Sequence, residues 1–327
     1  MNETQAISPF PVPYPAIAHL MQKRRVTLFL GAASSLVNGP PLQLPDGPQL
    51  ANDLMKLANY PGKNTDPLTK VSQYLVEFAG DRDLMLDYIK TRFHDNVPDD
   101  YRCSLTDFLS EIPTTCIPRL IVSTNYDTLI ERLLERQSVP YLCISHVLGR
   151  SKYAGRLIIY DKLGNFSKDN IWIRRDAEEM LDDRLSSEED HLVILYKMHG
   201  SAVSYIPRND RDEDLAGSLN SIVVTEQDYI DFLDKNTTQR LPIQVQKMLQ
   251  QSQFLFLGYS LVDWNFRLLL HRLRENQVGA DTKHWACLLH SDPVESVFWQ
   301  RRGVNIHYIS LDRFLADLKQ NLIKGGP

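Results

Sequence analysis

The stretch Val26–Asp46, VTLFLGAASSLVNGPPLQLPD, decides which fold this sequence predicts. Its first five residues form an apolar run with the length of a buried strand, and the run ends abruptly in the small residues 31–35 (GAASS). A turn of small residues lets the backbone approach a ligand closely, and its free N–H groups can face a phosphate. Ligands bind at this end of a strand in an open α/β sheet, so the stretch predicts a sheet and a site together.

The same junction, an apolar run followed at once by polar or small residues, recurs three times later in the chain. The runs 119–123 (RLIVS), 191–198 (HLVILYKM) and 254–257 (FLFL) lead into residues 124–127, 199–201 and 258–263. Helical patterns lie between these runs, and strand patterns return at 141–145, 222–224, 285–289 and 304–309. This alternation predicts an α/β fold with a doubly wound, Rossmann-like, mainly parallel sheet, in which the four strand ends can share one edge.

The domain organisation follows from the places where this alternation is broken. We predict a lead-in and a helix for residues 1–25 and one α/β domain for residues 26–327. Helical patterns without a convincing strand predict a small helical module inserted at 61–115, and the β-like runs RLIIY and IWIRR predict an irregular or β insertion at 148–190. Because the module directly follows the small-residue loop, we expect it to act as a regulatory gate.

Composition and charge exclude several classes of protein. With 327 residues, 43% of them hydrophobic and 24% charged, the chain has the make-up of an ordinary folded protein. A net charge of −5 argues against direct binding of nucleic acid, and no apolar run approaches the roughly 20 residues that span a bilayer. The N-terminus lacks the charged and apolar regions of a secretory signal. We therefore expect a cytoplasmic protein, and the GGP at its end leaves open that the chain belongs to a longer one.

The cysteines do not predict a metal site. Cys103, Cys116, Cys143 and Cys287 form no C-x-x-C pair, and no histidine lies close enough to complete a compact zinc site. Scattered cysteines of this kind are typical of reduced, buried thiols in a cytosolic protein.

Each residue at the four strand ends has both a functional and a structural interpretation. Residues 31–34 can offer amides and a hydroxyl to a diphosphate, or can form a packing turn. Asn125 can orient a water or a ribose hydroxyl, whereas Asp127 fits a helix cap better than a chemical role. His199 fits a core histidine, but Gly200 beside it leaves room for a ligand and the ordinary imidazole pKa suits a general base.

The fourth strand end has the same ambiguity. Residues 258–260 (GYS) are typical of a backbone platform for a ribose or a phosphate. Asp263 fits either the cap of the helix that follows or an acceptor for ribose hydroxyls.

Taken in order, GAASSLVNGPP, STNYDTLIE, YKMHGS and FLFLGYSLVDWNFR resemble the sirtuin-like (silent information regulator 2-like, SIR2-like) domains of bacterial antiviral defence systems. The resemblance runs from about Val26 to Ile309 and implies that 26–327 is an NAD-binding domain. It implies that Gly31, Ala32 and Ser34 hold the NAD pyrophosphate, as the family's G-A-G-x-S element does, with Ala33 in place of the second glycine. It also implies that Asn125 and Asp127 form the T-x-N-x-D element, that His199 is the catalytic histidine, and that Gly258, Ser260 and Asp263 lie near the adenosine half.

The resemblance further implies an activity. This chain lacks the zinc-binding cysteine pairs of the protein deacylases, and family members without them resemble NAD+ hydrolases that release nicotinamide and ADP-ribose. In those systems, phage components or partner proteins activate the enzyme, and NAD depletion halts infection. We therefore expect a metal-independent NAD+ hydrolase with NAD as its substrate and Asn125 and His199 as catalytic residues. We also expect a homo-oligomer or an activating partner protein, and no membrane or directly bound nucleic acid.

Two alternatives stay open at this point. The same pocket would serve an NAD-dependent deacylase or an ADP-ribosyltransferase. A non-catalytic nucleotide-binding assembly module, whose partner does the chemistry, would carry the same four stretches of sequence.

Overall fold

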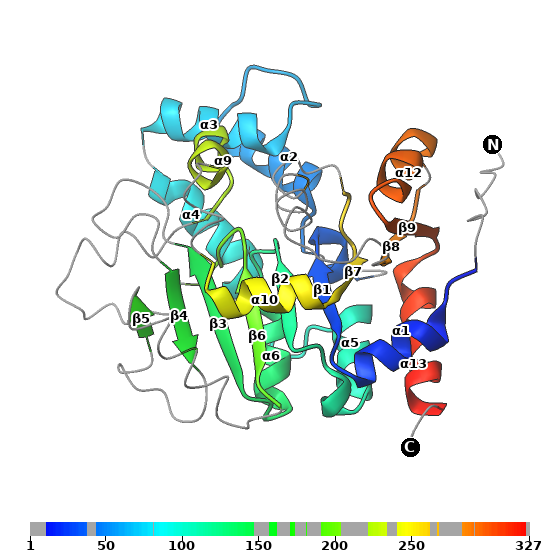
Figure 1. The fold of residues 1–327 in the computed structure, drawn as a ribbon. Helices are drawn as coiled ribbons and strands as arrows, with labels where there is room; N and C mark the ends of the chain where they lie inside the picture. The colour runs from blue at the N-terminus through cyan, green and yellow to red at the C-terminus, as the bar shows by residue number, and fades with distance from the viewer. Residues whose placement is uncertain are drawn as a thin grey trace.

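The computed structural model describes residues 11–37, 44–80, 82–146, 157–161, 171–173, 181, 191–203, 222–233, 241–261, 267, 283–290 and 292–324. In this part of the chain, nine strands form one sheet in the order β5-β4-β3-β6-β2-β1-β7-β8-β9 (Figure 1). The strands are β1 (Val26–Leu30), β2 (Leu120–Ser123), β3 (Tyr141–His146), β4 (Leu157–Asp161), β5 (Ile171–Ile173), β6 (Val193–Lys197), β7 (Gln253–Leu257), β8 (His284–Leu288) and β9 (Val304–Tyr308).

The sheet is parallel from β3 to β9, and only one edge departs from this pattern. Strand β4 pairs antiparallel with β3, and β5 pairs antiparallel with β4. These two strands lie within the predicted insertion at 148–190, most of which falls outside the described residues. Strand β1, the middle one of the seven parallel strands, pairs with β2 on one side and with β7 on the other. A hydrogen bond of 2.6 Å between Thr27 Oγ1 and Ser252 Oγ, 225 positions apart, accompanies the second pairing.

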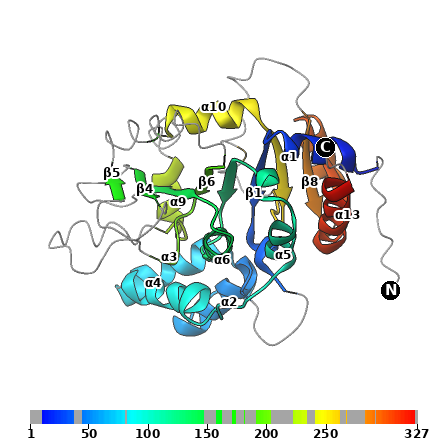
Figure 2. The same ribbon diagram turned by 90° about the horizontal axis from the view of Figure 1, so that it is seen from below.

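Helices cover both faces of the sheet, which confirms the predicted doubly wound, mainly parallel architecture. Figure 2 shows α10 on one side of the sheet and α5 and α6 on the other. None of the described helices combines the length and the apolar character that crossing a bilayer requires. The helices are α1 (Tyr14–Gln22), α2 (Gly47–Leu57), α3 (Leu68–Ala79), α4 (Arg82–Lys90), α5 (Ser104–Glu111), α6 (Leu129–Arg136), α9 (Glu226–Leu233), α10 (Ile243–Gln251), α12 (Pro293–Gln300) and α13 (Leu311–Lys324), with short helical turns η1 (Ala32–Ser35), η2 (Thr91–Asp95) and η3 (Thr114–Cys116).

Alternate residues of each central strand enter two separate hydrophobic clusters, one on each face of the sheet. In β1, Leu28 and Leu30 belong to the cluster that contains residues of α1–α6 and α13, whereas Phe29 belongs to the cluster that contains residues of α10 and α12. Strand β7 follows the same alternation. Burial on both faces explains why these strands read as continuous apolar runs in the sequence.

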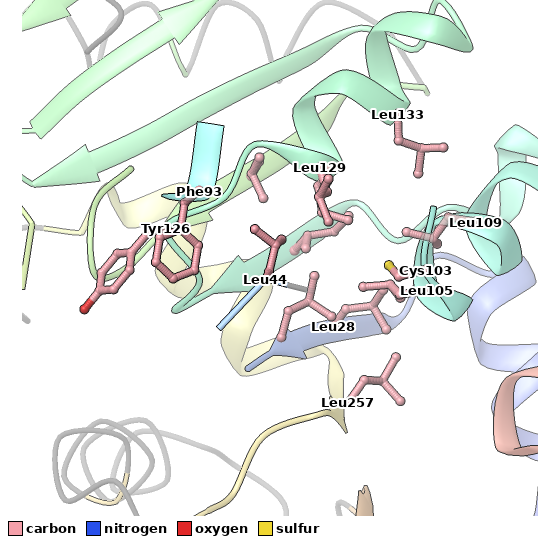
Figure 3. Packing of buried hydrophobic residues seen from close by; sticks show 14 of the residues in the cluster. Leu28, Leu44, Phe93, Cys103, Leu105, Leu109, Tyr126, Leu129, Leu133 and Leu257 are labelled. Atoms are coloured by element: carbon pink, nitrogen blue, oxygen red, sulfur yellow. The ribbon is translucent and has the colours of Figure 1, made fainter. Parts of the chain in front are cut away.

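The helices of segment 61–115 share the first of these clusters with the sheet. Leu75 of α3 and Ile89 of α4 are fully buried in the same cluster as Leu28. Figure 3 shows how residues of α5 and α6, such as Leu105 and Leu129, lie over β1 in this cluster. The segment is therefore packed as part of the domain core, and its action as a gate stays a prediction.

The expectation of a short strand at 222–224 is wrong. These residues form neither a strand nor a helix and take no place in the sheet. Their backbone groups are hydrogen-bonded to partners elsewhere, because Val223 N donates to His199 O (3.1 Å) and Val224 O accepts from Ser72 Oγ (2.8 Å). The β-branched residues Ile, Val and Val are buried in the core, and burial alone made them resemble a strand.

The ends of β1 and β7 meet in a close approach of two glycines. A Cβ added to Gly31 would lie 2.5 Å from Gly258 O, and one added to Gly258 would lie 2.1 Å from Ser34 N. Gly258 also has a φ of +62°, a conformation that other residues adopt at a cost. Backbone bonds join the two ends, since Gly31 N donates to Leu257 O and Ala33 N donates to Gly258 O, both at 3.1 Å. Glycine at both positions is thus explained by packing alone.

We expect Gly258→Ala to lower the free energy of unfolding by at least about 1–3 kcal/mol, because it combines a left-handed backbone with a clash against η1. Urea denaturation followed by circular dichroism measures this. Gly47→Ala is the matched control, since an added Cβ there meets nothing within 4 Å and we expect stability to stay level or rise by about 0.4–1 kcal/mol. Equal denaturation midpoints for Gly258→Ala and the wild type would contradict the argument.

Candidate functional site

The four strand ends singled out in the sequence lie at one edge of the sheet. Strands β6, β2, β1 and β7 are consecutive neighbours and run parallel. Ser123 pairs with Lys197, so Asn125 and His199 each stand two residues beyond paired positions on adjacent strands. Leu30 pairs with both Ser123 and Leu257, so Gly31 and Gly258 each follow a paired position directly. The sheet register thus places these stretches side by side.

The side chain of Asn125 joins the end of β2 to the turn η1. Its Nδ2 lies 3.0 Å from Gly31 O, 3.2 Å from Ser34 Oγ and 2.9 Å from Ser35 Oγ. The carbonyl oxygen of Gly31 can only accept, so the amide nitrogen must face the turn. Asn125 therefore holds the loop instead of capping the helix that follows.

Hydroxyl directions in this network are also determined. Ser34 Oγ donates to Gly31 O (2.8 Å) and Ser35 Oγ donates to Asp127 Oδ2 (2.8 Å), so both hydroxyls accept from Asn125. With its nitrogen directed at the turn, Asn125 has its Oδ1 on the other branch of the carboxamide, away from these three acceptors. That oxygen is buried and has no hydrogen-bond partner among the described residues. A buried acceptor of this kind calls for a donor, because leaving it unpaired costs free energy.

Asp127 has two structural roles in the buried part of the network. One carboxylate oxygen accepts from Ser35 Oγ, and the other accepts from the backbone N–H of Leu129 at 3.1 Å. The second contact satisfies an amide at the start of α6, which agrees with the helix-capping interpretation. Asp127 is only 4% exposed, and it connects the loop after β1 to the helix after β2.

Residues just before α5 hold the turn η1 from its other side. Tyr101 donates its hydroxyl to Ser35 O (2.8 Å), and Cys103 Sγ lies 3.3 Å from Ser34 O. Burial raises the pKa of Tyr101 to about 12 and also raises the pKa of the Cys103 thiol. Both groups therefore stay protonated near neutral pH and act as hydrogen-bond donors to the turn.

Two backbone amides of the turn are engaged inside the protein. Ala33 N donates to Gly258 O, and Ser34 N donates to Gly31 O (2.9 Å). A diphosphate bound at this loop would therefore have to be held by other groups. Ser34 is itself 1% exposed, which makes it a support of the loop in this conformation.

A pocket of about 520 Å³ opens beside Asn125. This figure includes space that is open to solvent. The polar lining consists of Ser35, Asp46, Thr124, Asn125 and Asp127. Its apolar walls are formed by Leu44, Leu50, Leu68 and Phe93, together with Tyr126, whose ring meets Phe93 edge to face at 5.5 Å. Figure 3 shows Phe93, Tyr126 and Leu44 next to one another at this end of the sheet.

One wall of the pocket depends on a well-capped helix. Asp46 accepts from Gln49 N at 2.8 Å, while the Gln49 side chain accepts from Asp46 N at 2.9 Å. This reciprocal pair is a capping box, and Pro48 suits the first turn that follows. The start of α2, which lines the pocket, is thereby fixed.

His199 is buried, at 4% exposure, and does not belong to the residues that line this pocket. Its ring packs edge-on against Tyr229 (5.4 Å) and Phe232 (6.0 Å) of α9. The adjacent Gly200 has a φ of +80°, and Ala202 N then donates to Tyr126 O at 2.8 Å. The loops carrying His199 and Asn125 are thus directly hydrogen-bonded to each other.

The remaining sequence candidates are arranged differently. Gly258 contacts η1 through its backbone, and Ser260 is exposed near it, but neither lines the pocket. Asp263 lies outside the described residues. Within the described ranges, no group of three or more His, Cys, Asp or Glu side chains is arranged to hold a metal ion.

Sequence reasoning missed a buried ion pair beneath the site. Lys197 Nζ lies 3.4 Å from Glu131 Oε1, both side chains are less than 5% exposed, and Nζ also donates to Asp127 O. Lys197 lies on the same face of β6 as Val193 and Leu195, which belong to the hydrophobic cluster that contains Leu28. A lysine at that point of a two-residue alternation was the signal that could have identified it. Ser35, which bridges Asn125 and Asp127, was quoted in the loop but given no role.

The sequence of this chain matches the model of one known protein family. The sequence model of the SIR2-like domain matches residues 119–307. No curated protein matches the chain. A solved structure described as "Structural Basis for the Mechanism and Regulation of Sir2 Enzymes" is 12% identical, with a TM-score of 0.42, and the alignment covers 96% of this chain and 98% of that chain.

The matched region includes β2, β6 and β7 with the loops that carry Asn125, His199 and Gly258, and it spans more than half of the chain. The chain therefore belongs to the SIR2-like domain family.

We expect Lys197→Met to lower the free energy of unfolding by about 3–5 kcal/mol, because it leaves Glu131 charged and buried without its ion-pair partner. The double variant Lys197→Met/Glu131→Leu should recover most of that loss. Guanidinium denaturation of both variants measures the difference. Lys319→Met is the control, since its pair with Glu111 is solvent-exposed and worth about 0–1 kcal/mol. A single variant as stable as the wild type would show that the pair contributes nothing.

Proposed function

We propose that this protein hydrolyses NAD+ to nicotinamide and ADP-ribose at the pocket beside Asn125. The observation that carries the proposal is the Asn125 carboxamide, whose nitrogen is fixed by η1 and whose buried oxygen has no partner among the described residues. Membership of a family whose members are typically NAD-dependent enzymes supports the choice of substrate.

The chemistry needs few groups. The bond between C1′ of the ribose and the pyridinium nitrogen breaks, and its electron pair neutralises the departing nicotinamide. A water oxygen then bonds to C1′, and the proton that this water loses must pass to a base. Because the leaving group becomes neutral by departing, the protein has to orient the ribose, stabilise an oxocarbenium-like centre and admit one water.

Asn125 suits the orienting role in this proposal. Its Oδ1 can accept a hydrogen bond from a ribose hydroxyl or from the attacking water, and its orientation is set before any ligand binds. Preorganised polar groups are effective because they need no rearrangement during the reaction. The aromatic rings of Phe93 and Tyr126, in the walls of the same pocket, offer an apolar surface for the nicotinamide.

His199 suits the role of proton acceptor, directly from water or by polarising a ribose hydroxyl. Histidine is the side chain whose ordinary pKa lies closest to neutrality, as a general base requires. The hydrogen bond between Ala202 N and Tyr126 O ties the loop of His199 to the loop of Asn125. That link supports an arrangement in which both residues serve one substrate.

At the level of the organism, we propose that the protein is an effector of bacterial antiviral defence that acts by depleting NAD. The support is the ordered resemblance to the sirtuin-like domains of such systems. The proposal includes activation by self-assembly or by a partner protein, and no metal. Deacylation or ADP-ribosyl transfer would use the same pocket. The molecule that carries the ADP-ribose after the reaction distinguishes each of them from hydrolysis.

We expect purified protein to convert NAD+ to free nicotinamide and ADP-ribose, separated by liquid chromatography. Asn125→Ala and His199→Ala should each lower kcat by about 10²-fold or more, because they remove an orienting group and a general base. Asn321→Ala in α13 and His290→Ala after β8 are matched controls that should keep wild-type turnover.

The same assay in lysate of infected cells tests for a required activator. Radiolabelled ADP-ribose found on protein would favour a transferase instead. NAD bound but uncleaved both in purified protein and in infected lysate would overturn the proposal and favour a non-catalytic module.

A further inference from the structure

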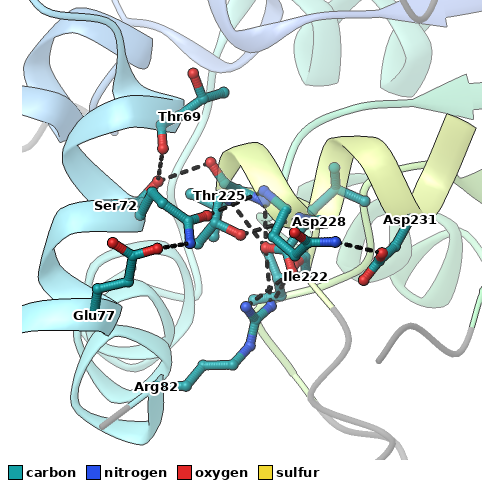
Figure 4. Close-up of polar contacts among 12 residues, drawn as sticks. Thr69, Ser72, Glu77, Arg82, Ile222, Thr225, Asp228 and Asp231 are labelled. Atoms are coloured by element: carbon teal, nitrogen blue, oxygen red, sulfur yellow. Dashed lines mark hydrogen bonds and ion pairs between the residues drawn. The ribbon is translucent and has the colours of Figure 1, made fainter. Parts of the chain in front are cut away.

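Residues 222–233 form a connection between His199 and the helical pair α3–α4. The segment consists of residues 222–225, which belong to no helix or strand, and the helix α9. Figure 4 shows its polar contacts with residues of α3 and α4, and Figure 1 shows α9 beside α3 at the same end of the sheet as α2. These contacts carry a further inference about how His199 is positioned.

One side of the segment holds His199. Val223 N donates to His199 O at 3.1 Å, and the rings of Tyr229 and Phe232 lie edge-on to the imidazole at 5.4 and 6.0 Å. Tyr126 donates its hydroxyl to Val223 O at 2.7 Å. The backbone of 223 therefore links the loop of His199 with the pocket wall next to Asn125.

The other side of the segment is attached to α4 by one arginine. Arg82 Nη1 lies 2.9 Å from Asp228 Oδ1, and Arg82 Nη2 lies 3.0 Å from Asp228 Oδ2, so the pairing is bidentate. The same Nη2 donates to Ile222 O at 2.7 Å. Arg82 thus binds both Ile222, at the start of the segment, and Asp228, in the first turn of α9. A planar guanidinium with fixed donors is suited to holding two acceptors in one geometry.

Asp228 makes this attachment rigid. Its Oδ2 also accepts from Val224 N (3.1 Å) and Thr225 N (2.9 Å), while Thr225 Oγ1 accepts from Asp228 N (3.1 Å). Asp228 is 7% exposed. One carboxylate thus binds both Arg82 and the backbone amides that follow residue 223, so hydrogen bonds and the chain connect Arg82 with Val223, whose N–H donates to His199 O.

Helix α3 adds neutral contacts to the same segment. Ser72 Oγ donates to Val224 O at 2.8 Å, and Gln73 Oε1 accepts from Gln227 N at 3.0 Å. Among the described residues, the Arg82–Asp228 pair is the contact between α3–α4 and this segment in which both partners carry a charge. It is the stronger and more directional link, since charge-assisted bidentate hydrogen bonds exceed neutral ones.

We propose that Arg82 is a positioning residue for His199, acting through Asp228 and the backbone of 222–224. This inference rests on the proposed role of His199 as the proton acceptor. Movement of α4 changes the orientation of the imidazole, so the helical segment 61–115 controls the activity of His199 through this contact.

The test compares Arg82→Ala with Arg82→Lys and Asp228→Asn in the full chain. Asp228→Asn keeps an oxygen for the amides of Val224 and Thr225 but loses the charge that binds Arg82. Arg136→Ala is the control, because Arg136 donates to Asp99 O between η2 and α5 and contacts no part of 222–233. Thermal denaturation establishes that each variant is folded.

The decisive measurement is independent of NAD turnover. Histidine labelled with ¹³C and ¹⁵N gives imidazole signals for the nine histidines, and His199→Gln assigns the signal of His199. We expect that signal to shift in Arg82→Ala and Asp228→Asn, to move part of the way in Arg82→Lys, and to stay in place in Arg136→Ala. An unmoved signal in Arg82→Ala, or an equal shift in Arg136→Ala, would overturn the inference.

Kinetics then test the consequence for catalysis. In Arg82→Ala we expect kcat to fall about tenfold or more while KM for NAD+ stays close to that of the wild type, because misplacing a reacting group affects the chemical step. A rise in KM at unchanged kcat would contradict a positioning role. If the wild type leaves NAD+ uncleaved both when purified and in lysate of infected cells, the proposed function fails, and the imidazole signals still decide whether Arg82 positions His199.

Discussion

The organisation of the site depends on the hydrogen bonds that Asn125 Nδ2 makes to the turn after β1. One carbonyl and two hydroxyls surround that nitrogen, and one of the hydroxyls is bonded in turn to Asp127. The amide is therefore held from a single side, and its oxygen is directed away from the turn. A loop of small residues has no stiffness of its own, so these bonds define both its shape and the direction in which the acceptor points. The buried Lys197–Glu131 pair supports the same arrangement from below, through the backbone of Asp127.

The architecture could be predicted because buried parallel strands leave a clear pattern in the sequence. A strand that is buried on both faces is apolar along its whole length. The polar or small residue that follows such a strand is therefore easy to recognise in the sequence. Asn125 and His199 were singled out for that reason, and the sheet register then explains why the strand ends that carry them lie side by side. Gly258 was found as well, but its nearness to Gly31 and Ser34 gives it a packing reason that the sequence left open.

What the sequence could not reveal are contacts whose partners lie far along the chain. Residues 222–224 have the composition of a strand, yet their hydrogen bonds go to His199, Ser72 and Asp228, which no local pattern encodes. Arg82 and Asp228 each look like ordinary surface charges in helical patterns. Their 146-residue separation hides the fact that they bind each other. Lys197 differs, because its position in an apolar alternation was visible and was overlooked.

The placement of β1 in the middle of the parallel strands has a consequence for how the chain folds. Its two neighbours come from distant parts of the sequence, and the contact of Thr27 with Ser252 closes a loop of 225 positions. Closing such loops costs chain entropy before the pairing returns any stability, so topologies of this kind fold slowly. During synthesis, the small-residue turn and its strand emerge first and must wait for β7, the strand that completes their environment. Until β7 is made, the edge of β1 that pairs with it is exposed. An exposed apolar strand edge in a growing chain can aggregate or bind chaperones.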